Sequence, residues 1–268
     1  MSKQGGNERT VSNSPSIRYF FLNNKGVSQL HTGNDALQLN HMRGTLIVLE
    51  GTDGSGKSTQ FQLLLARFKK AHRPVATLKF PQYGKKSSGL VEEYLAGKYG
   101  KNPEAVSPYA ASLFYALDRF DAAAKIKKWL KDGKTVLLDR YVDSNAGHQG
   151  GKIKNPTARK QFLHWLYDIE YRILSVPRPD LVIILHAPAS MNAALLTHKK
   201  RDIHERNAQH LKDTERAYLW LAAKYPKNHR VITCAPQGKL LPPHEIHEKI
   251  WHIVEPLFIK AKKYEALS

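Results

Sequence analysis

The chain has 268 residues, 41% of them hydrophobic, which suits one α/β domain with a large core or at most two small domains. Its single cysteine, Cys234, excludes an intramolecular disulfide and fits a reducing compartment, and no apolar run is long enough to span a bilayer. The net charge of +19 is typical either of affinity for nucleic acid or a membrane surface, or of a site for polyanionic substrates. Because the lysines are spread along the chain, with no basic stripe interleaved with aromatic residues, we expect nucleic-acid binding to be at most secondary. We expect a cytoplasmic protein without membrane association.

The N-terminal residues differ in composition from the rest of the chain. Residues 1–41 are rich in Ser, Asn, Gln and Gly, and they carry only +2 of the net charge. Their one apolar patch, Tyr19–Leu22, is too short for a secretory signal, and a transit peptide should be richer in Arg. We therefore expect residues 1–43 to be a disordered extension, with Met42 as a candidate natural start, and residues 44–268 to form the folded domain.

From Gly44 onward, short apolar segments alternate with longer amphipathic ones. The apolar segments predict strands at Thr45–Leu49, Val75–Phe80, Thr135–Leu138, Leu181–Leu185 and Val231–Cys234. The amphipathic segments predict helices at Lys57–Ala71, Leu90–Ala96, Ser107–Lys131, Pro156–Ile173, Ser190–His198, Arg206–Tyr225 and His244–Ala261. Short, continuous apolar strands are typical of a parallel sheet covered by helices on both faces. We predict an α/β fold with a doubly wound, five-stranded parallel sheet that binds ligands at the carboxyl ends of its strands.

The stretch Glu50–Thr59 joins the first predicted strand to the first predicted helix. It carries the pattern Gly-x-x-x-x-Gly-Lys-Ser at 51–58, which in this context indicates a phosphate-binding loop rather than a chance glycine-rich turn. The glycines let backbone N–H groups converge on phosphate oxygens, while Lys57 can reach the β- and γ-phosphates and the Ser58 hydroxyl can hold Mg²⁺. The predicted triphosphate contacts are Gly51, Thr52, Asp53, Gly54, Ser55, Gly56, Lys57, Ser58 and Thr59.

The pair Asp139-Arg140 follows the third predicted strand. An apolar strand that ends in an acid has the form of the second element of a phosphate-loop fold, with the acid directed towards Mg²⁺. Most motor ATPases have a second acid next, which activates water, whereas this chain has Arg140. An arginine beside the metal-side acid suits a second phosphate, held by a bidentate contact. The pair therefore favours phosphoryl transfer to a phosphorylated acceptor over hydrolysis.

The long predicted helix places Tyr115 and Arg119 four residues apart, on one face. An aromatic ring and a guanidinium there could stack on a base and hold a phosphate. A core aromatic residue and a surface ion pair between Asp118 and Arg119 explain the same spacing equally well.

A dense cationic stretch, His198–Arg206, follows the fourth predicted strand. Such runs are usually solvated. In a phosphate-loop kinase, however, a basic lid that closes over the triphosphate belongs in this place, so we favour a lid formed by Lys199, Lys200 and Arg201.

Together these segments resemble the thymidylate kinase family of phosphate-loop kinases, which act on deoxythymidine monophosphate (dTMP). The resemblance rests on LEGTDGSGKST at 49–59, FPQY at 80–83, LFYALDR at 113–119, DRYVDSNAGHQGG at 139–151 and the basic segment at 199–206. It extends from Gly44 to the C-terminus in matching order and spacing. It implies a thymidylate kinase-like domain at 44–268 with the P-loop NTPase fold and a short basic lid, and it implies a homodimer.

The resemblance also implies roles for individual residues. Asp53 corresponds to a carboxylate near the deoxyribose 3′-hydroxyl and the metal, and Arg119 and Arg140 correspond to arginines that hold the acceptor 5′-phosphate. Mg²⁺ is expected at Ser58 and Asp139, partly through water. Residues expected to line the acceptor site are Asp53, Phe80, Pro81, Tyr115, Arg119, Arg140, Ser144, Asn145, His148 and Gln149. Further ATP contacts are expected from Lys199, Lys200 and Ala235, and catalysis is expected to depend on Lys57, Arg140, Arg201 and Asp53. The Phe80–Pro81 peptide bond is often cis in the family, and Tyr115 stands where a phenylalanine usually stacks on thymine.

One position supports an inference from the family pattern, and three positions depart from it. Gly54, where some members have arginine, implies that catalytic cations come from the lid. Gln82 stands where many members have an arginine, and His148 stands where many have a tyrosine near the 2′ position of the sugar. His186 ends the fourth strand where aspartate is frequent, and the sequence offers no physical reason for it.

The implied reaction is transfer of the γ-phosphoryl group of ATP to dTMP, giving ADP and dTDP for dTTP synthesis, with Mg²⁺ as cofactor. No strong general base is needed, because the second pKa of a phosphate monoester is about 6. Three alternatives stay open: a kinase for dUMP or a deoxynucleoside, a nucleic-acid-stimulated ATPase, and a paralogue that binds nucleotide without turnover.

Overall fold

The computed structural model describes residues 44–188, 191, 202–204 and 207–258. These residues all belong to one compact unit, Leu39–Ser268. The predicted extension at 1–43, the predicted helix at 190–198 apart from Met191, and the basic residues Lys199, Lys200 and Arg201 lie outside the described residues. The extension and the lid therefore stay predictions.

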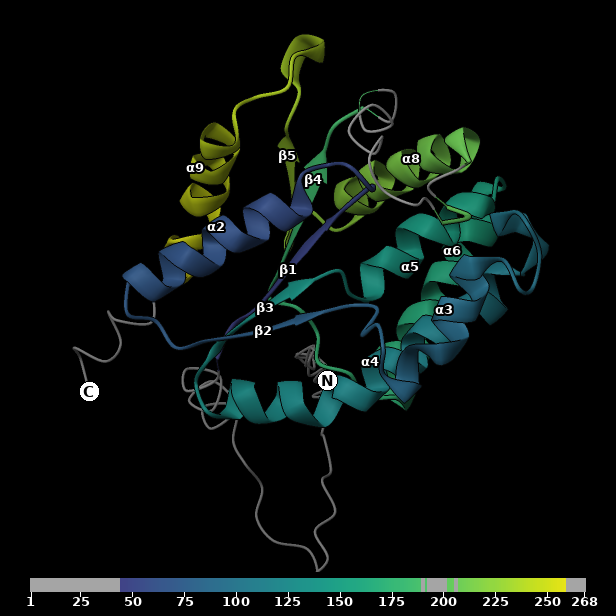
Figure 1. The fold of residues 1–268 in the computed structure, drawn as a ribbon, viewed down its shortest axis with the longest axis horizontal. Coiled ribbons are helices and arrows are strands. Elements are labelled where there is room, and N and C mark those ends of the chain that lie inside the picture. The colour runs from purple at the N-terminus through teal and green to yellow at the C-terminus, as the bar shows by residue number, and fades with distance from the viewer. Residues whose placement is uncertain (1–43, 189–190, 192–201, 205–206, 259–268) are drawn as a thin grey trace, which may run out of the picture. The chain divides into compact units, whose positions relative to one another are not determined.

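A five-stranded sheet forms the centre of the fold (Figure 1). The strands are β1 Leu46–Gly51, β2 Val75–Lys79, β3 Thr135–Asp139, β4 Leu181–His186 and β5 His229–Thr233, in the order β2-β3-β1-β4-β5. Every neighbouring pair is parallel. All six residues of β1 are buried, as expected of a central strand with both faces covered. The predicted parallel α/β fold is confirmed.

Helices cover both faces of the sheet (Figure 1). They are α2 Lys57–Lys70, α3 Gly89–Ala96, α4 Pro108–Lys131, α5 Val142–His148, α6 Pro156–Tyr167, α8 Ala208–Lys224 and α9 Pro243–Val254. Short 3₁₀ turns, η1 Lys86–Ser88, η2 Pro103–Ala105, η3 Gly150–Lys152 and η5 Pro236–Gly238, lie between them. Side-chain caps from Ser107, Asn155 and Asn207 begin α4, α6 and α8, since each side chain accepts a hydrogen bond from a backbone N–H of the first turn.

Alternate residues of β1 face two separate hydrophobic cores. Leu46 and Val48 pack in the core that α4, α6 and α8 cover, and Ile47 and Leu49 pack in the core that α2 and α9 cover. This alternation follows from the two-residue period of a strand. The core under α2 and α9 contains Phe61, Leu64, Phe68, Ile246, Ile250 and Val254. The two cores hold the carboxyl end of β1, and with it the phosphate-binding loop, in a fixed place.

Two local structures differ from the sequence prediction, and both shape the site. Residues 142–148, to which the sequence analysis assigns no helix, form α5, and all seven are buried. The predicted helix Pro156–Ile173 changes at Asp168 into a π-helical turn, η4 Asp168–Ile173, which carries the buried Glu170. Both elements bring polar side chains into the interior.

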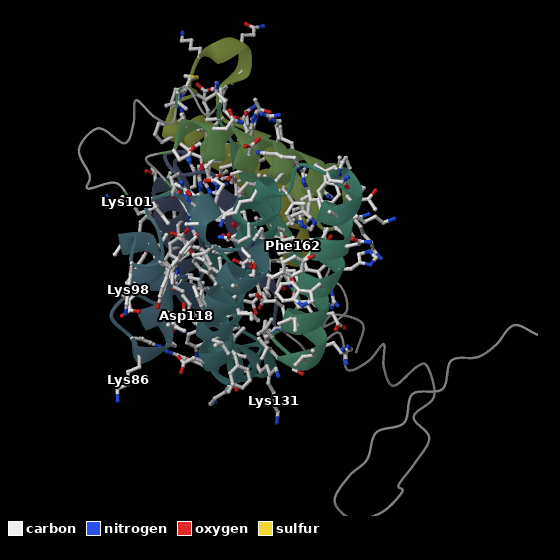
Figure 2. The ribbon with its side chains drawn as sticks, turned by 90° about the vertical axis from the view of Figure 1, so that its right-hand side faces the viewer. Lys86, Lys98, Lys101, Asp118, Lys131 and Phe162 are labelled. Carbon is white, nitrogen blue, oxygen red and sulfur yellow. The ribbon has the colours of Figure 1, made fainter. Side chains whose placement is uncertain are left out.

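Figure 2 shows Lys86, Lys98, Lys101 and Lys131 at the edge of one view, all of them exposed, whereas Asp118 and Phe162 are buried. None of the described helices has the length and apolar character needed to cross a membrane.

Candidate active site

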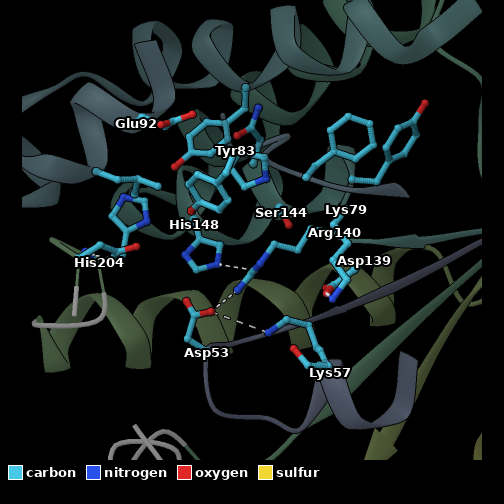
Figure 3. A pocket seen from close by; sticks show the side chains of 18 of the residues that line it. Asp53, Lys57, Lys79, Tyr83, Glu92, Asp139, Arg140, Ser144, His148 and His204 are labelled. Carbon is cyan, nitrogen blue, oxygen red and sulfur yellow. Dashed lines mark hydrogen bonds and ion pairs between the residues drawn. The ribbon is translucent and has the colours of Figure 1, made fainter. Parts of the chain in front are cut away.

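A cavity of about 1200 Å³ lies at the carboxyl ends of β1, β2 and β3 (Figure 3). Predicted site residues that line it are Asp53, Gly54, Gly56, Lys57, Ser58, Thr59, Phe80, Pro81, Tyr115, Arg119, Asp139, Arg140, Ser144, Asn145, His148 and Gln149. Four other predicted residues do not line it. Gly51, Thr52 and Ser55 are buried in the loop beneath the cavity, and Ala235 packs in the core under α9. Residues that are far apart in the sequence, from 53 to 149, therefore surround one cavity.

The phosphate-binding loop depends on glycine at two positions. Gly51 has a φ of 140°, and a Cβ there would lie 2.5 Å from the carbonyl oxygen of Leu185. Gly56 has a φ of 86° and caps the N-terminus of α2 in the left-handed conformation. The loop therefore turns sharply out of β1 and directs the N-terminus of α2 towards the cavity, which is the arrangement that binds anions.

Lys57 is held at the mouth of the loop. Its Nζ donates to the carbonyl oxygens of Gly51 and Thr52, at 3.0 and 2.7 Å, and lies 3.9 Å from Asp53 Oδ1. Burial and the nearby Arg140 lower the pKa of Lys57 from 10.5 to about 8. Phosphate oxygens in the loop would stabilise the charged form and replace the carbonyl contacts.

Arg140 joins the loop to the opposite wall (Figure 3). Its Nη2 forms an ion pair with Asp53 Oδ1, and its Nη1 lies 3.4 Å from the Gly51 carbonyl oxygen and 3.2 Å from His148 Nε2. Burial alone would raise the pKa of Asp53, but Arg140 and Lys57 hold it well below its usual range. Arg140 itself has a φ of 67°, a conformation that is strained for a non-glycine residue. The strain marks Arg140 as a residue that the surrounding structure holds in a fixed orientation.

Arg119 lies in a different environment from the one expected. It is 1% exposed, and its Nε and Nη2 donate to the carboxylate of Glu170, while Nη1 donates to the carbonyl oxygen of Tyr141. Each guanidinium nitrogen thus already has a partner, which leaves further N–H groups only on the two Nη atoms. The alternative of a surface ion pair between Asp118 and Arg119 is wrong. Asp118 is buried and accepts hydrogen bonds from Gln82 and Ser87.

Asp139 and Ser58 border the same part of the cavity. Asp139 Oδ1 is buried and makes no hydrogen bond to any described residue, and Lys79 Nζ lies 3.7 Å from Oδ2. A buried carboxylate oxygen without a partner is costly unless something binds it. The donor set of one carboxylate and one hydroxyl fits Mg²⁺, which prefers oxygen ligands and retains several waters.

The remaining cavity wall comes from β2, α4 and α5. The Phe80–Pro81 peptide bond is cis. Tyr115 is held edge-on to Tyr94, with 6.4 Å between the ring centroids. Asn145 Nδ2 donates to the carbonyl oxygen of Ser112 at 3.0 Å, whereas neither amide atom of Gln149 has a hydrogen-bond partner among the described residues. Asn145 is therefore held in place by the backbone of α4.

The structure explains two departures from the family pattern. The amide of Gln82 donates to the backbone and side chain of Asp118, at 2.9 and 3.2 Å, so Gln82 ties the segment after β2 to α4. His186 Nε2 lies 2.8 Å from Glu215 Oε1, which connects β4 to α8. Both side chains form contacts between elements.

Sequence reasoning missed Glu50 and two histidines. Glu50 is fully buried and accepts hydrogen bonds from the Tyr141 backbone N–H and from the Ser144 and Tyr218 hydroxyls. Burial, reinforced by Asp143, raises its pKa to about 7. An acid at the end of a wholly apolar strand is a signal that could have revealed it. His204 lines the cavity and His210 lies beside it. His204 belongs to the cationic stretch, which was interpreted only through its charge, and His210 belongs to the predicted helix Arg206–Tyr225, where no role was expected of it.

Comparisons with known proteins agree with this geometry. A model of the thymidylate kinase family matches residues 49–242. The chain is 35% identical over 187 residues to the thymidylate kinase of Mycobacterium tuberculosis, which covers 67% of this chain and 86% of that protein. It is 34% identical over 220 residues to a probable thymidylate kinase of Thermococcus onnurineus, covering 80% of this chain and 98% of that protein.

Among solved structures, a thymidylate kinase from Candida albicans is similar in fold, with a TM-score of 0.62 and 24% identity. The match covers 80% of this chain and 92% of that chain. Because the family model spans more than half of the chain and includes the loop, Arg140 and α5, the chain belongs to the thymidylate kinase family.

Proposed function

We propose that this protein transfers the γ-phosphoryl group of ATP to dTMP, giving dTDP and ADP. The observation that carries the proposal is the continuity of the cavity. Lys57 and Ser58, which suit a triphosphate, and Arg140 and Asn145, which suit a phosphorylated nucleoside, line one space. Membership of the thymidylate kinase family supports ATP as donor and dTMP as acceptor.

The chemistry needs alignment of two anions more than it needs a covalent catalyst. An oxygen of the dTMP phosphate attacks the γ-phosphorus, the bond from that phosphorus to the β-bridging oxygen breaks, and ADP leaves with the electron pair. We propose that Lys57 holds the β- and γ-phosphates and that Arg140, shared with Asp53, holds the acceptor phosphate. These cations offset the repulsion between the phosphates. Arg201 and the neighbouring lysines, outside the described residues, are proposed to add positive charge.

We propose that Mg²⁺ binds at Ser58 and Asp139, partly through water. The unpaired, buried Oδ1 of Asp139 supports this, as does the position of Ser58 on the same cavity. When bound, Mg²⁺ neutralises charge on the β- and γ-phosphates. Asp139 orients the ligand from the end of β3, and Lys79 balances the second carboxylate oxygen.

The other predicted contacts remain proposals for the acceptor nucleoside. Phe80, Pro81 and Tyr115 are proposed to contact the base, and His148 is proposed to lie near the 2′ position of the sugar. Ser144, Asn145 and Gln149 are proposed to complete this wall, with Arg119 supporting the acceptor phosphate. Ala235 is proposed to contact the adenine of ATP.

A coupled ADP-release assay across acceptors tests the proposed function. With Mg-ATP, we expect dTMP to support the fastest turnover, above dUMP, thymidine and other monophosphates. Thymidine as the better acceptor would indicate a nucleoside kinase. ADP release stimulated by DNA or RNA without dTMP would indicate a nucleic-acid-dependent ATPase. No turnover with any acceptor would indicate a paralogue that only binds nucleotide.

We also propose that the protein is a homodimer. Along α4, four apolar side chains at helical spacing are exposed by 40% to 53%, namely Tyr109, Leu113, Leu117 and Phe120. A continuous apolar stripe on one exposed face favours a protein partner, and an identical copy would bury it by two-fold symmetry.

Light scattering after size-exclusion chromatography should give a dimer mass for the wild type and a monomer mass for Leu117→Glu. Lys70→Glu, an exposed change on α2, which covers the opposite face of the sheet, should stay dimeric, and a monomeric wild type would refute the proposal.

We propose a cytoplasmic location. The one cysteine of the chain, Cys234, is a free thiol, and the absence of an intramolecular disulfide fits a reducing compartment. Fractionation of cells that express the full chain would test this proposal, with recovery in a membrane or secreted fraction contradicting it.

A further inference from the structure

Three histidines that are separated in the sequence meet at one side of the cavity. His148 ends α5, His204 lies in the segment 202–204, and His210 lies in the first turn of α8. All three are at least nine-tenths buried, and one ring nitrogen from each lies within 4.8 Å of the other two. Figure 3 shows His148 and His204 on the same side of the cavity. The proposed function places only His148, near the sugar, and it gives no role to His204 or His210.

The cluster offers neutral imidazoles, which are the form that binds metals. Burial lowers the pKa of all three rings, and the positive charges of Arg140 and Lys152 lower it further, to about 4 for His210. Each ring is therefore uncharged near neutral pH, with one nitrogen lone pair available. Three buried, uncharged imidazoles in contact are an unusual set of groups for a hydrophobic core.

We propose that His148, His204 and His210 bind a divalent transition-metal ion of the zinc class. The separation of His148 Nδ1 and His210 Nε2 is 3.4 Å. Two nitrogens on a tetrahedral Zn²⁺ with bonds of about 2.0–2.1 Å would lie at about this separation. The ring of His204 stacks on His148 at an interplanar angle of 13° and lies 4.5 Å, between centroids, from His210. The His204 ring must therefore turn out of this stack for its nitrogen to enter the same shell.

The donor set also determines which ions fit. Imidazole nitrogens suit Zn²⁺, Cu²⁺, Ni²⁺ and Co²⁺, whereas Mg²⁺ and Ca²⁺ prefer oxygen ligands. The site is therefore chemically distinct from the proposed Mg²⁺ position at Ser58 and Asp139. His148 and His204 line the cavity, so a fourth coordination position faces solvent or a bound ligand.

The hydrogen bonds around the cluster specify what metal binding must rearrange. Arg140 can only donate, so His148 Nε2 accepts from Arg140 Nη1 and His148 Nδ1 carries the hydrogen directed at His210. A metal on His148 Nδ1 displaces that hydrogen, which must move to Nε2, and the contact with Arg140 is then lost. His204 Nε2 likewise exchanges its 2.9 Å contact with the Tyr94 hydroxyl for the metal, or binds through Nδ1.

Charges near the cluster act in both directions. Arg140, Lys57 and Lys152 oppose a divalent cation at the cluster. Asp53 and Asp213 attract it. Burial lowers the pKa of Lys152 to about 8, so it still carries positive charge near neutral pH and opposes the ion. Because these charges oppose one another, we expect the bound ion to be one that forms strong bonds to imidazole rather than one held by charge alone.

Cobalt titration of the full chain, with any purification tag removed and metals stripped, tests the proposal. We expect one Co²⁺ per chain to give the visible absorption of a four-coordinate site, Zn²⁺ to displace it, and excess Mg²⁺ to leave it unchanged. His210→Gln should weaken cobalt binding at least tenfold. His164→Gln, which changes an exposed histidine on α6, should leave binding unchanged.

Folding is checked separately from binding. Thermal unfolding without metal shows whether His210→Gln and a second variant, His204→Gln, are folded. Zinc should raise the midpoint of the wild type through mass action but not that of either variant. If both variants unfold, X-ray absorption of the wild type with one bound zinc replaces them, and a shell with three imidazoles is expected. Absence of the four-coordinate cobalt spectrum, wild-type affinity in both folded variants, or a zinc shell of oxygens alone would overturn the proposal.

Discussion

The two ends of the cavity are built in different ways. At the donor end, consecutive residues of one loop supply backbone N–H groups and Lys57. At the acceptor end, α4, α5 and η4 each contribute side chains that pair with one another in the interior, as Arg119 does with Glu170. A substitution at the donor end should therefore change the chemistry alone, whereas one at the acceptor end should change stability as well.

Glu170→Gln should have the largest effect on stability. It leaves the charge of Arg119 buried without a counterion, which costs roughly 3–5 kcal/mol in the free energy of unfolding. Denaturant unfolding would measure it. Asp168→Asn, which breaks an exposed ion pair with Arg172 in the same turn, is the matched control and should cost less than about 1 kcal/mol. Equal losses of unfolding free energy in the two variants would contradict the distinction between the donor and acceptor ends of the cavity.

Lys57→Ala should reduce the rate of dTDP formation by about two to three orders of magnitude. Among the described residues, Lys57 makes its polar contacts with the loop carbonyls and Asp53, and it belongs to neither hydrophobic core, so its removal leaves both cores intact. Initial rates and thermal unfolding should be measured together. Lys70→Ala, an exposed change at the other end of α2, should affect neither. A large loss of stability in Lys57→Ala would contradict the separation of chemistry from folding at this end.

Glu50→Gln should change how stability depends on pH. The carboxyl has a pKa of about 7 in the folded protein against 4.5 for the ordinary group, so the folded state retains its proton more strongly. The stability from this group is fully present below pH 4.5 and is lost as pH rises through 7. As pH rises from 4.5 to 7 and above, the free energy of unfolding of the wild type should fall by on the order of 3 kcal/mol relative to that of Glu50→Gln. This is because each pKa unit is worth about 1.4 kcal/mol. Parallel curves of unfolding free energy against pH would show that Glu50 is not protonated in the fold.

Asp139→Asn should have a smaller effect, confined to Mg²⁺. Loss of one carboxylate near the metal should raise the Mg²⁺ concentration for half-maximal rate by about 10- to 100-fold. Asp132→Asn, at an exposed ion pair with Lys128, is the control. An unchanged Mg²⁺ requirement would place the metal elsewhere.

The donor end could be predicted because its information is local. Eight consecutive residues, 51–58, specify the turn from β1 into α2, and the apolar strands on either side specify a buried sheet. Asp139 and Arg140 were likewise chosen for their place at the end of a strand, and both line the cavity.

The acceptor end could not be predicted to the same depth, because its pairings are between distant residues. Arg119 and Glu170 are 51 positions apart, and nothing near Arg119 shows that a carboxylate occupies its guanidinium. Residues 142–148 have the polar composition of a loop, but they form a buried helix because Glu50 and Ser112 accept hydrogen bonds from Ser144 and Asn145. The histidine cluster joins residues 148, 204 and 210, which no spacing rule connects.

The joining of the two ends in one reaction is tested most directly by the ratio of dTDP to ADP. Both products would be quantified chromatographically for the wild type and for Arg140→Ala, with dTMP or thymidine as acceptor. We expect one dTDP per ADP in the wild type, negligible ADP with thymidine, and a loss of at least about a hundredfold in both products in Arg140→Ala. ADP formed without dTDP, or a near-normal dTDP rate in Arg140→Ala, would show that the cavity does not bring the two phosphates together.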